Sequence, residues 1–272
     1  MQRSILIITL LMSCTLSLHA QIGQQDESKL YAETKQLGQF IRRFNAEEDA
    51  KGDRLYQGDK EWRDRNLRRK YLSMLFDKER SWDKKTVESF VERMTDKSSP
   101  VYLDFHGGDW RAEVQATFSY EGKDVHGRLL MRLKEEPVGS RWVIEQVWMP
   151  PFEAAAKKDT SNAGFLHPLS HELAFMNLHK VLRQSKSPYA YIAQDEEIDQ
   201  LSIFAYEIRR GRLQFKQVDD IRFHFFLDAG WYFELAYQQR DSYNRGWLMV
   251  NLLPLATPEL RSQLRQQLFS QP

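Results

Sequence analysis

The chain has 272 residues, and its 39 basic and 38 acidic side chains give a formal net charge of +1. A nearly neutral protein has no net field that attracts nucleic acid or an anionic membrane, so we expect neither as a partner. The single cysteine, Cys14, has no second cysteine to pair with. A disulfide framework is therefore excluded, and the chain must fold on a hydrophobic core of its own.

The first twenty residues have the pattern of a secretory signal peptide. Arg3 supplies a positive charge, the stretch from Ser4 to Leu18 is almost continuously apolar, and Ala20 offers a small residue at the predicted cut. The apolar stretch is shorter than the roughly 20 residues of a transmembrane helix. We therefore expect a periplasmic or secreted protein that keeps no transmembrane segment after cleavage. The alternative is a lipoprotein anchored through Cys14, although apolar residues continue beyond that cysteine.

Three amphipathic helices are predicted next. Apolar residues recur at helical spacing from Leu30 to Phe44, from Leu67 to Phe76 and from Val87 to Met94. Residues 45–60 hold two glycines and many charges, and are predicted to form a loop. A basic cluster interleaved with acidic residues is expected to be a solvated helix face; it comprises Arg63, Arg65, Arg68, Arg69 and Lys70.

From residue 101 the hydrophobic period changes from that of a helix to that of a strand. Alternation predicts strands over 101–106, 110–120, 125–134 and 141–149, and Pro150 and Pro151 end this region. Helices followed by an antiparallel meander predict an α+β fold with helices packed on a curved sheet.

The second half repeats this order. A helix is expected from Pro168 or Ser170, strands over 201–208, 213–226, 231–238 and 247–253, and a short closing helix over 258–269. The predicted organisation is a signal peptide over 1–20, an α+β domain over 21–151, a linker over 152–166 and a second α+β domain over 167–272.

The two halves end in similar hairpins. Gly127 precedes Trp142 at nearly the same distance as Gly230 precedes Trp247, and a proline follows each closing strand. Two interpretations stay open: an internal duplication, or two unrelated amphipathic hairpins that look alike.

Three helices with a long first one, followed by a strongly alternating meander, resemble the nuclear-transport-factor-like superfamily, also called SnoaL-like. The resemblance covers residues 27–150 and again 168–254, and it implies two similar cone-like units. In that superfamily a sheet curls around a helix and forms an apolar pocket. Some members are isomerases or dehydratases that use a pocket Asp with a Tyr or His, and many are non-catalytic modules. The fold alone therefore does not select a function.

Asp104 and His106 are the candidates for acid–base chemistry. Together with Tyr102 they alternate with apolar residues, so a carboxylate and an imidazole would share one face of the predicted strand. The alternative is that this face of an edge strand is simply exposed to solvent.

No metal or cofactor is expected. Zinc needs two histidines on one helix face and a third ligand, and the densest histidine group does not offer that spacing. This group is interpreted as a helix start with surface histidines; it contains His167, His171, Glu172 and His179.

Aromatic residues make up 12% of the chain. Those in register on strands are expected in the core: Trp110, Trp142, Trp148, Trp231 and Trp247. Others are candidates for exposed binding residues: Tyr232, Tyr237, Tyr243, Trp62 and Trp82.

These patterns lead to two hypotheses of different class. The first is a non-catalytic exported envelope protein that acts as a binding or assembly module for a protein, a glycan or a small apolar ligand. The alternative is a cofactor-independent pocket enzyme of the isomerase, dehydratase or hydrolase type, with Asp104 and His106 as acid and base. No ligand-binding residue is assigned by the sequence.

Overall fold

The computed structural model describes residues 36–156 and 199–269. The expected leader, most of the linker, the helix expected near residue 168 and the group around His171 lie outside these ranges. A helix over 36–45 is followed by α3 (Arg65–Met74), α4 (Lys84–Met94), β1 (Asp109–Tyr120), β2 (Lys123–Glu136), β3 (Gly139–Trp148), α5 (Pro150–Ala156), α7 (Gln200–Arg209), β4 (Leu213–Leu227), β5 (Trp231–Gln238), β6 (Gly246–Pro254) and α8 (Pro258–Phe269). The predicted α+β class is confirmed.

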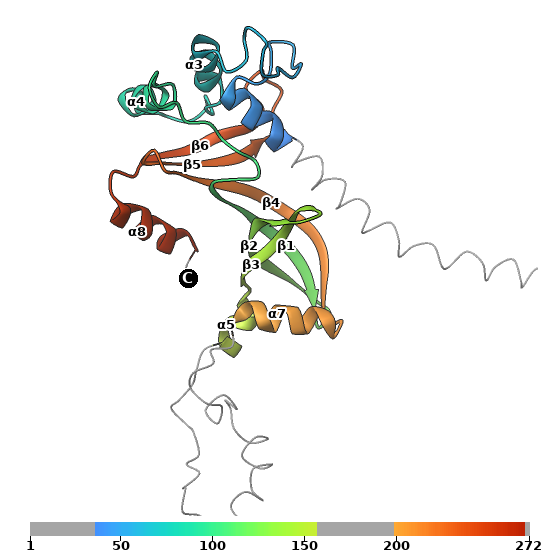
Figure 1. The fold of residues 1–272 in the computed structure, drawn as a ribbon. Coiled ribbons are helices and arrows are strands. Elements are labelled where there is room, and N and C mark those ends of the chain that lie inside the picture. Colours follow the sequence, from blue (N-terminus) through green and yellow to red (C-terminus); the bar gives the residue numbers. More distant parts are fainter. Residues whose placement is uncertain (1–35, 157–198, 270–272) are drawn as a thin grey trace, which may run out of the picture.

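All six strands belong to one antiparallel sheet in the order β3-β2-β1-β4-β5-β6. Two three-stranded meanders therefore meet where β1 pairs with β4, from Asp109 opposite Phe226 to Tyr120 opposite Leu213. The sheet is strongly curved, and α5 and α7 lie at the end opposite the helix over 36–45, α3 and α4 (Figure 1). Two separate cone-like units are not confirmed, because strands from both halves share this sheet.

The main core fills one face of the sheet. Alternate residues of β1, from Trp110 to Phe118, point into it, as do Phe225 of β4 and Phe233 of β5. The rings of Phe225 and Phe233 stack with centroids 4.8 Å apart, and Phe225 stacks on Trp110 at 5.3 Å. The predicted burial of the strand tryptophans is confirmed for four of them, and Trp142 is half-buried against the same core.

The opposite face of the sheet is partly covered by the closing helix, α8, whose predicted bounds are confirmed. Phe269 packs there against Phe226 and Tyr232. Tyr232 is fully buried, so its expected exposure is wrong. Alternation correctly places Tyr232 and Trp231 on different faces of the sheet, but α8 excludes water from the face that carries Tyr232.

Two predicted strands are absent. Residues 201–208 lie in α7, where the Asp199 side chain accepts a hydrogen bond from the Ser202 N–H and caps the helix. Residues 101–106 form no strand, because their backbone bonds to the helical layer instead of to a neighbouring strand. The Asn45 side chain both donates to the Leu103 carbonyl at 2.8 Å and accepts from the Leu103 N–H at 2.9 Å.

Arg68 corrects the expectation of a fully solvated basic cluster, since it is only 1% exposed. Its guanidinium donates to the carbonyl oxygens of Phe44 at 2.9 Å and Met94 at 2.8 Å, and also to that of Val101. Burial lowers the pKa of Arg68 to about 10. Two of these carbonyls end helices, where the helix dipole is negative and favours a cation.

Candidate functional site: a pocket on the polar face of the sheet

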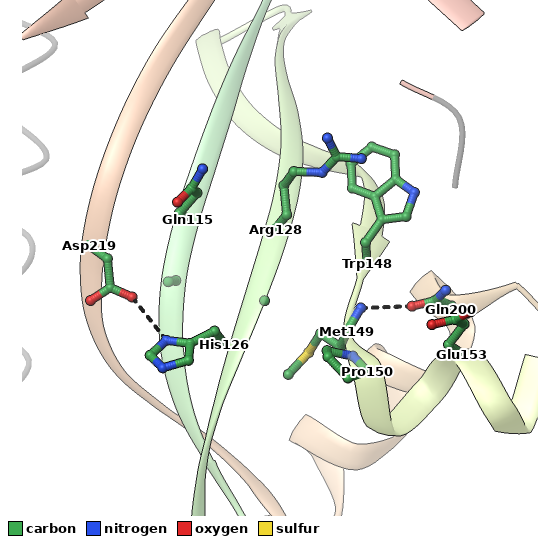
Figure 2. Close-up of a pocket in the computed structure, with 11 residues that line it drawn as sticks. Gln115, His126, Arg128, Trp148, Met149, Pro150, Glu153, Gln200 and Asp219 are labelled. Atoms are coloured by element: carbon green, nitrogen blue, oxygen red, sulfur yellow. Dashed lines mark hydrogen bonds and ion pairs between the residues drawn. The ribbon is translucent and has the colours of Figure 1, made fainter. Parts of the chain in front are cut away.

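A pocket of about 530 Å³ lies beside the end of α8, on the sheet face that α8 partly covers. Strands β1, β2 and β4 supply its floor, and the chain leaving β3 supplies a wall together with α5 and α7 (Figure 2). We call it the polar-face pocket; it is lined by Gln115, Ala116, His126, Gly127, Arg128, Trp148, Met149, Pro150, Glu153, Gln200 and Asp219. Its size is within the range of sites for small molecules.

Thr117, His126 and Asp219 form a hydrogen-bonded group at one side of the pocket. The Thr117 hydroxyl donates to Asp219 Oδ2 at 2.6 Å and lies 3.0 Å from His126 Nδ1, which is 3.6 Å from the same carboxylate oxygen. Burial alone would raise the pKa of Asp219, but hydrogen bonds from Thr117, Gln217 and His126 outweigh it and hold the pKa below its usual range. Because the Thr117 proton is engaged with Asp219, His126 does not activate this hydroxyl as a nucleophile.

Arg128 and Trp148 form the opposite side. The guanidinium lies 3.9 Å from the centroid of the indole ring, so one face of Trp148 is already covered. Arg128 Nη1 also donates to the Leu268 carbonyl at 3.4 Å, which ties the pocket to the end of α8. The cation is therefore held in place by contacts within the protein, and Figure 2 shows it beside the indole.

A buried polar chain continues from Arg128 beneath α8. Glu113 Oε2 lies 3.7 Å from Arg128 and 3.5 Å from His224 Nε2, and His224 Nδ1 lies 2.8 Å from the Tyr232 hydroxyl. Burial raises the pKa of Tyr232, so the phenol stays protonated beside His224. Burial also disfavours the charge on Glu113, but His224 and Arg128 outweigh it and lower the pKa of that carboxyl.

The wall of the pocket is fixed by local geometry. The Gln200 side chain, at the start of α7, accepts a hydrogen bond from the Met149 N–H at 2.8 Å and is only 2% exposed. Gly127 is required where β2 passes the wall, because a Cβ there would lie 2.9 Å from Met149 Cγ and 3.3 Å from the Phe118 ring. The pocket is thus preorganised by backbone and buried side chains.

Asp104 and His106 do not meet in a cavity. Asp104 Oδ1 accepts from the backbone N–H of His106, whereas the His106 ring is 2.8 Å from Ser140 Oγ and 3.3 Å from Glu135 Oε1. The His106 side chain is 62% exposed. A separate pocket of about 400 Å³ includes Asp104 but not His106. This geometry gives the acid–base hypothesis no support.

The sequence reasoning missed the polar-face pocket, although one signal for it was present. A hairpin turn at Glu121 and Gly122 pairs Thr117 with His126, so these two could have been placed side by side from the sequence. Asp219 joins them only through the pairing of β1 with β4, which no local pattern predicts.

The expected exposed aromatics have mixed outcomes. Tyr243 is fully exposed and Tyr237 is 39% exposed, as predicted. Trp62 and Trp82 are half-buried, and Trp82 packs on Phe76 and donates to the Asp77 carbonyl at 2.7 Å.

Two general features concern only the described ranges. No three His, Cys, Asp or Glu side chains in them are grouped so as to hold a metal ion. None of the helices in these ranges combines the length and apolar character needed to cross a bilayer.

In comparisons with known proteins, no family model, no curated protein and no solved structure matches this chain.

Proposed function

We propose that this protein is a non-catalytic, exported envelope module that binds a glycan in the polar-face pocket. The observation that carries the proposal is the lining: six planar polar side chains surround a wall made by Trp148, Met149 and Pro150. The six are Gln115, His126, Arg128, Glu153, Gln200 and Asp219. Export is supported by the leader pattern of the first twenty residues.

A saccharide fits this chemistry better than an apolar or strongly charged ligand. Planar amide, imidazole and carboxylate groups offer donors and acceptors side by side, which suits the neighbouring hydroxyls of a sugar ring. Pro150, the exposed member of the apolar wall, can take the C–H face of the ring. The charge of Asp219 is offset by hydrogen bonds from Thr117 and Gln217, so the pocket does not demand a charged partner.

Binding without catalysis is supported by the way the reactive groups are used. His126 is 81% exposed, and the Thr117 hydroxyl beside it donates to Asp219. His126 Nδ1 lies within hydrogen-bond reach of the Thr117 hydroxyl, but the proton of that hydroxyl is directed to Asp219, so the pair is not arranged as a base and a nucleophile. The pocket therefore offers recognition groups without a nucleophile.

The test is a titration of the purified full chain with neutral mono- and disaccharides. Binding is monitored by ¹⁵N NMR and by calorimetry. We expect saturable binding and chemical-shift changes at the pocket. Gln115→Ala and His126→Ala should each weaken binding by about tenfold, since each removes about one hydrogen-bonding group. Gln214→Ala, an exposed residue of β4 outside the lining, is the matched control. Absence of saccharide binding at millimolar concentration, or equal binding by all variants, would contradict the proposal.

A further inference from the structure

A second pocket, of about 320 Å³, lies at the other end of the sheet, between the helix over 36–45, α3 and the chain entering β6. We call it the Tyr71 pocket. Its polar lining includes Gln39, Arg43, Asp49 and Asn244, and its apolar lining includes Met74 and Trp247. None of these residues lines the polar-face pocket, so the two sites are independent.

Tyr71 is the unusual residue of this pocket. It is only 8% exposed, and its hydroxyl is buried with no hydrogen-bond partner within the described part of the chain. Burial, reinforced by the nearby Asp49 and Glu48 carboxylates, raises the pKa of Tyr71, so the hydroxyl is a neutral donor. A buried donor without an acceptor is costly, and a native protein rarely keeps one without reason.

Neither neighbouring carboxylate accepts a hydrogen bond from the Tyr71 hydroxyl. Glu48 accepts hydrogen bonds from Gln39 at 3.1 Å, Arg42 at 3.3 Å and Arg43 at 3.0 Å. Asp49 Oδ1 accepts the backbone N–H groups of residues 51 and 53, each at 2.8 Å. The Tyr71 hydroxyl is thus left without an acceptor among the described residues, and a bound ligand can supply one.

The mouth of the pocket is held rigidly. The Asn244 side chain donates to the Phe76 carbonyl at 3.0 Å and accepts the Lys78 N–H at 2.9 Å, which joins the loop before β6 to the segment that follows α3. This loop carries Tyr243, which is fully exposed, beside Met74, which is 53% exposed. Exposed aromatic and methionine side chains on a fixed support are typical of binding surfaces.

We infer that the Tyr71 pocket binds a small neutral group that presents a carbonyl oxygen to the Tyr71 hydroxyl and packs its apolar body on Met74 and Tyr243. An anion is disfavoured, because the Glu48 and Asp49 carboxylates lie near the hydroxyl and the Arg43 charge is paired with Glu48. The carbonyl belongs either to a peptide or to a free small molecule, and both sources share the same recognition chemistry.

Two probes separate these sources: N-acetyl-leucine methylamide represents a peptide, and caprolactam represents a free cyclic amide. Each is titrated to about 20 mM into the full chain, a range that detects weak millimolar binding, and ¹⁵N NMR follows the shifts. Binding of either probe, with shifts at residues of the Tyr71 pocket, supports the inference and identifies the preferred source. Failure of both probes to shift these residues overturns it.

The decisive variant is Tyr71→Phe, which removes only the hydroxyl oxygen. It should weaken probe binding by about five- to tenfold, as expected for one neutral hydrogen bond, while Tyr206→Phe on the distant α7 leaves binding unchanged. Unaltered binding by Tyr71→Phe overturns the inference.

The unliganded protein gives a second readout. Removing an unpartnered hydroxyl should leave the melting temperature of Tyr71→Phe equal to or above that of the wild type. A decrease of about 4 °C or more would mean that the hydroxyl already has a partner within the protein, and would overturn the inference.

Discussion

Replacing Arg68 with methionine tests how the helical layer is held together. The substitution keeps an unbranched side chain but removes the guanidinium that bonds three backbone carbonyls, those of Phe44, Met94 and Val101. These carbonyls belong to the end of the helix over 36–45, the end of α4 and the segment before β1. Arg68 thus links three chain segments that are not joined to one another by helix or sheet hydrogen bonds.

The magnitude follows from two opposing contributions. Hydrogen bonds from a charged donor contribute about 1.5–3 kcal/mol each, so three of them contribute about 4.5–9 kcal/mol. Burying the guanidinium costs several kcal/mol, since it removes a charge from water. The methionine variant avoids this cost, which offsets part of the lost hydrogen-bond energy. The carbonyls of Phe44 and Val101 lose this donor, whereas that of Met94 keeps the Val101 N–H at 3.1 Å. We therefore expect Arg68→Met to lower the free energy of unfolding by about 3–5 kcal/mol.

The assay is urea-induced unfolding followed by tryptophan fluorescence, with the midpoint and slope fitted together. Arg69→Met is the matched control, because Arg69 is the next residue of α3 and its side chain makes no hydrogen bond or ion pair recorded in the described ranges. The control should change the free energy of unfolding by less than about 0.5 kcal/mol. A loss below about 1 kcal/mol for Arg68→Met would refute the reasoning, since it would mean that the cost of burying the cation cancels its bonds.

Two further predictions concern the core and α8. Trp247 is 5% exposed and packs on Phe223 at 4.8 Å, so Trp247→Ala should cost about 3–5 kcal/mol in the same urea assay; a loss below about 1 kcal/mol would mean that the ring is not part of the core. Burial disfavours the charge on Asp109, but Arg261 and Arg265 of α8 outweigh it and hold the pKa of Asp109 below its usual range. A lowered pKa stabilises the folded state at neutral pH, and this contribution is lost as the pH falls below about 4. The protection factors of the α8 amides, which correct exchange for its intrinsic pH dependence, should therefore fall in acid, and Asp109→Asn should lower them in the same way at pH 7. An Asp109→Asn protein with unchanged α8 protection would contradict this.

Most elements could be predicted because their hydrophobic period is local information. The alternation of β1 and the bounds of α8 follow directly from the sequence. The segment 201–208 misled the prediction because Leu201 and Ile203 alternate with polar residues as in a strand. The Asp199 cap and the packing of Phe204 on Phe118, with ring centroids 5.7 Å apart, select the helix instead.

The functional residues were harder to predict because their partners are distant in the sequence. Arg68 looks like a surface charge until three separate segments bring carbonyl groups to it. The polar-face pocket likewise depends on Asp219 reaching Thr117 across the pairing of β1 with β4. Charge and composition describe a residue's chemistry, but only tertiary pairing determines which groups it meets.

The central pairing of β1 with β4 also constrains the order in which the protein folds. The first meander can form from neighbouring hairpins, yet its β1 side stays an unpaired edge until β4, much later in the chain, docks along it. Because β1 carries Trp110, Val114 and Phe118 on one face, this unpaired edge exposes apolar side chains and free backbone hydrogen-bonding groups until β4 pairs with it. Closing so long a loop makes folding slow. We therefore expect a chain interrupted after β3 to aggregate more readily than the full chain.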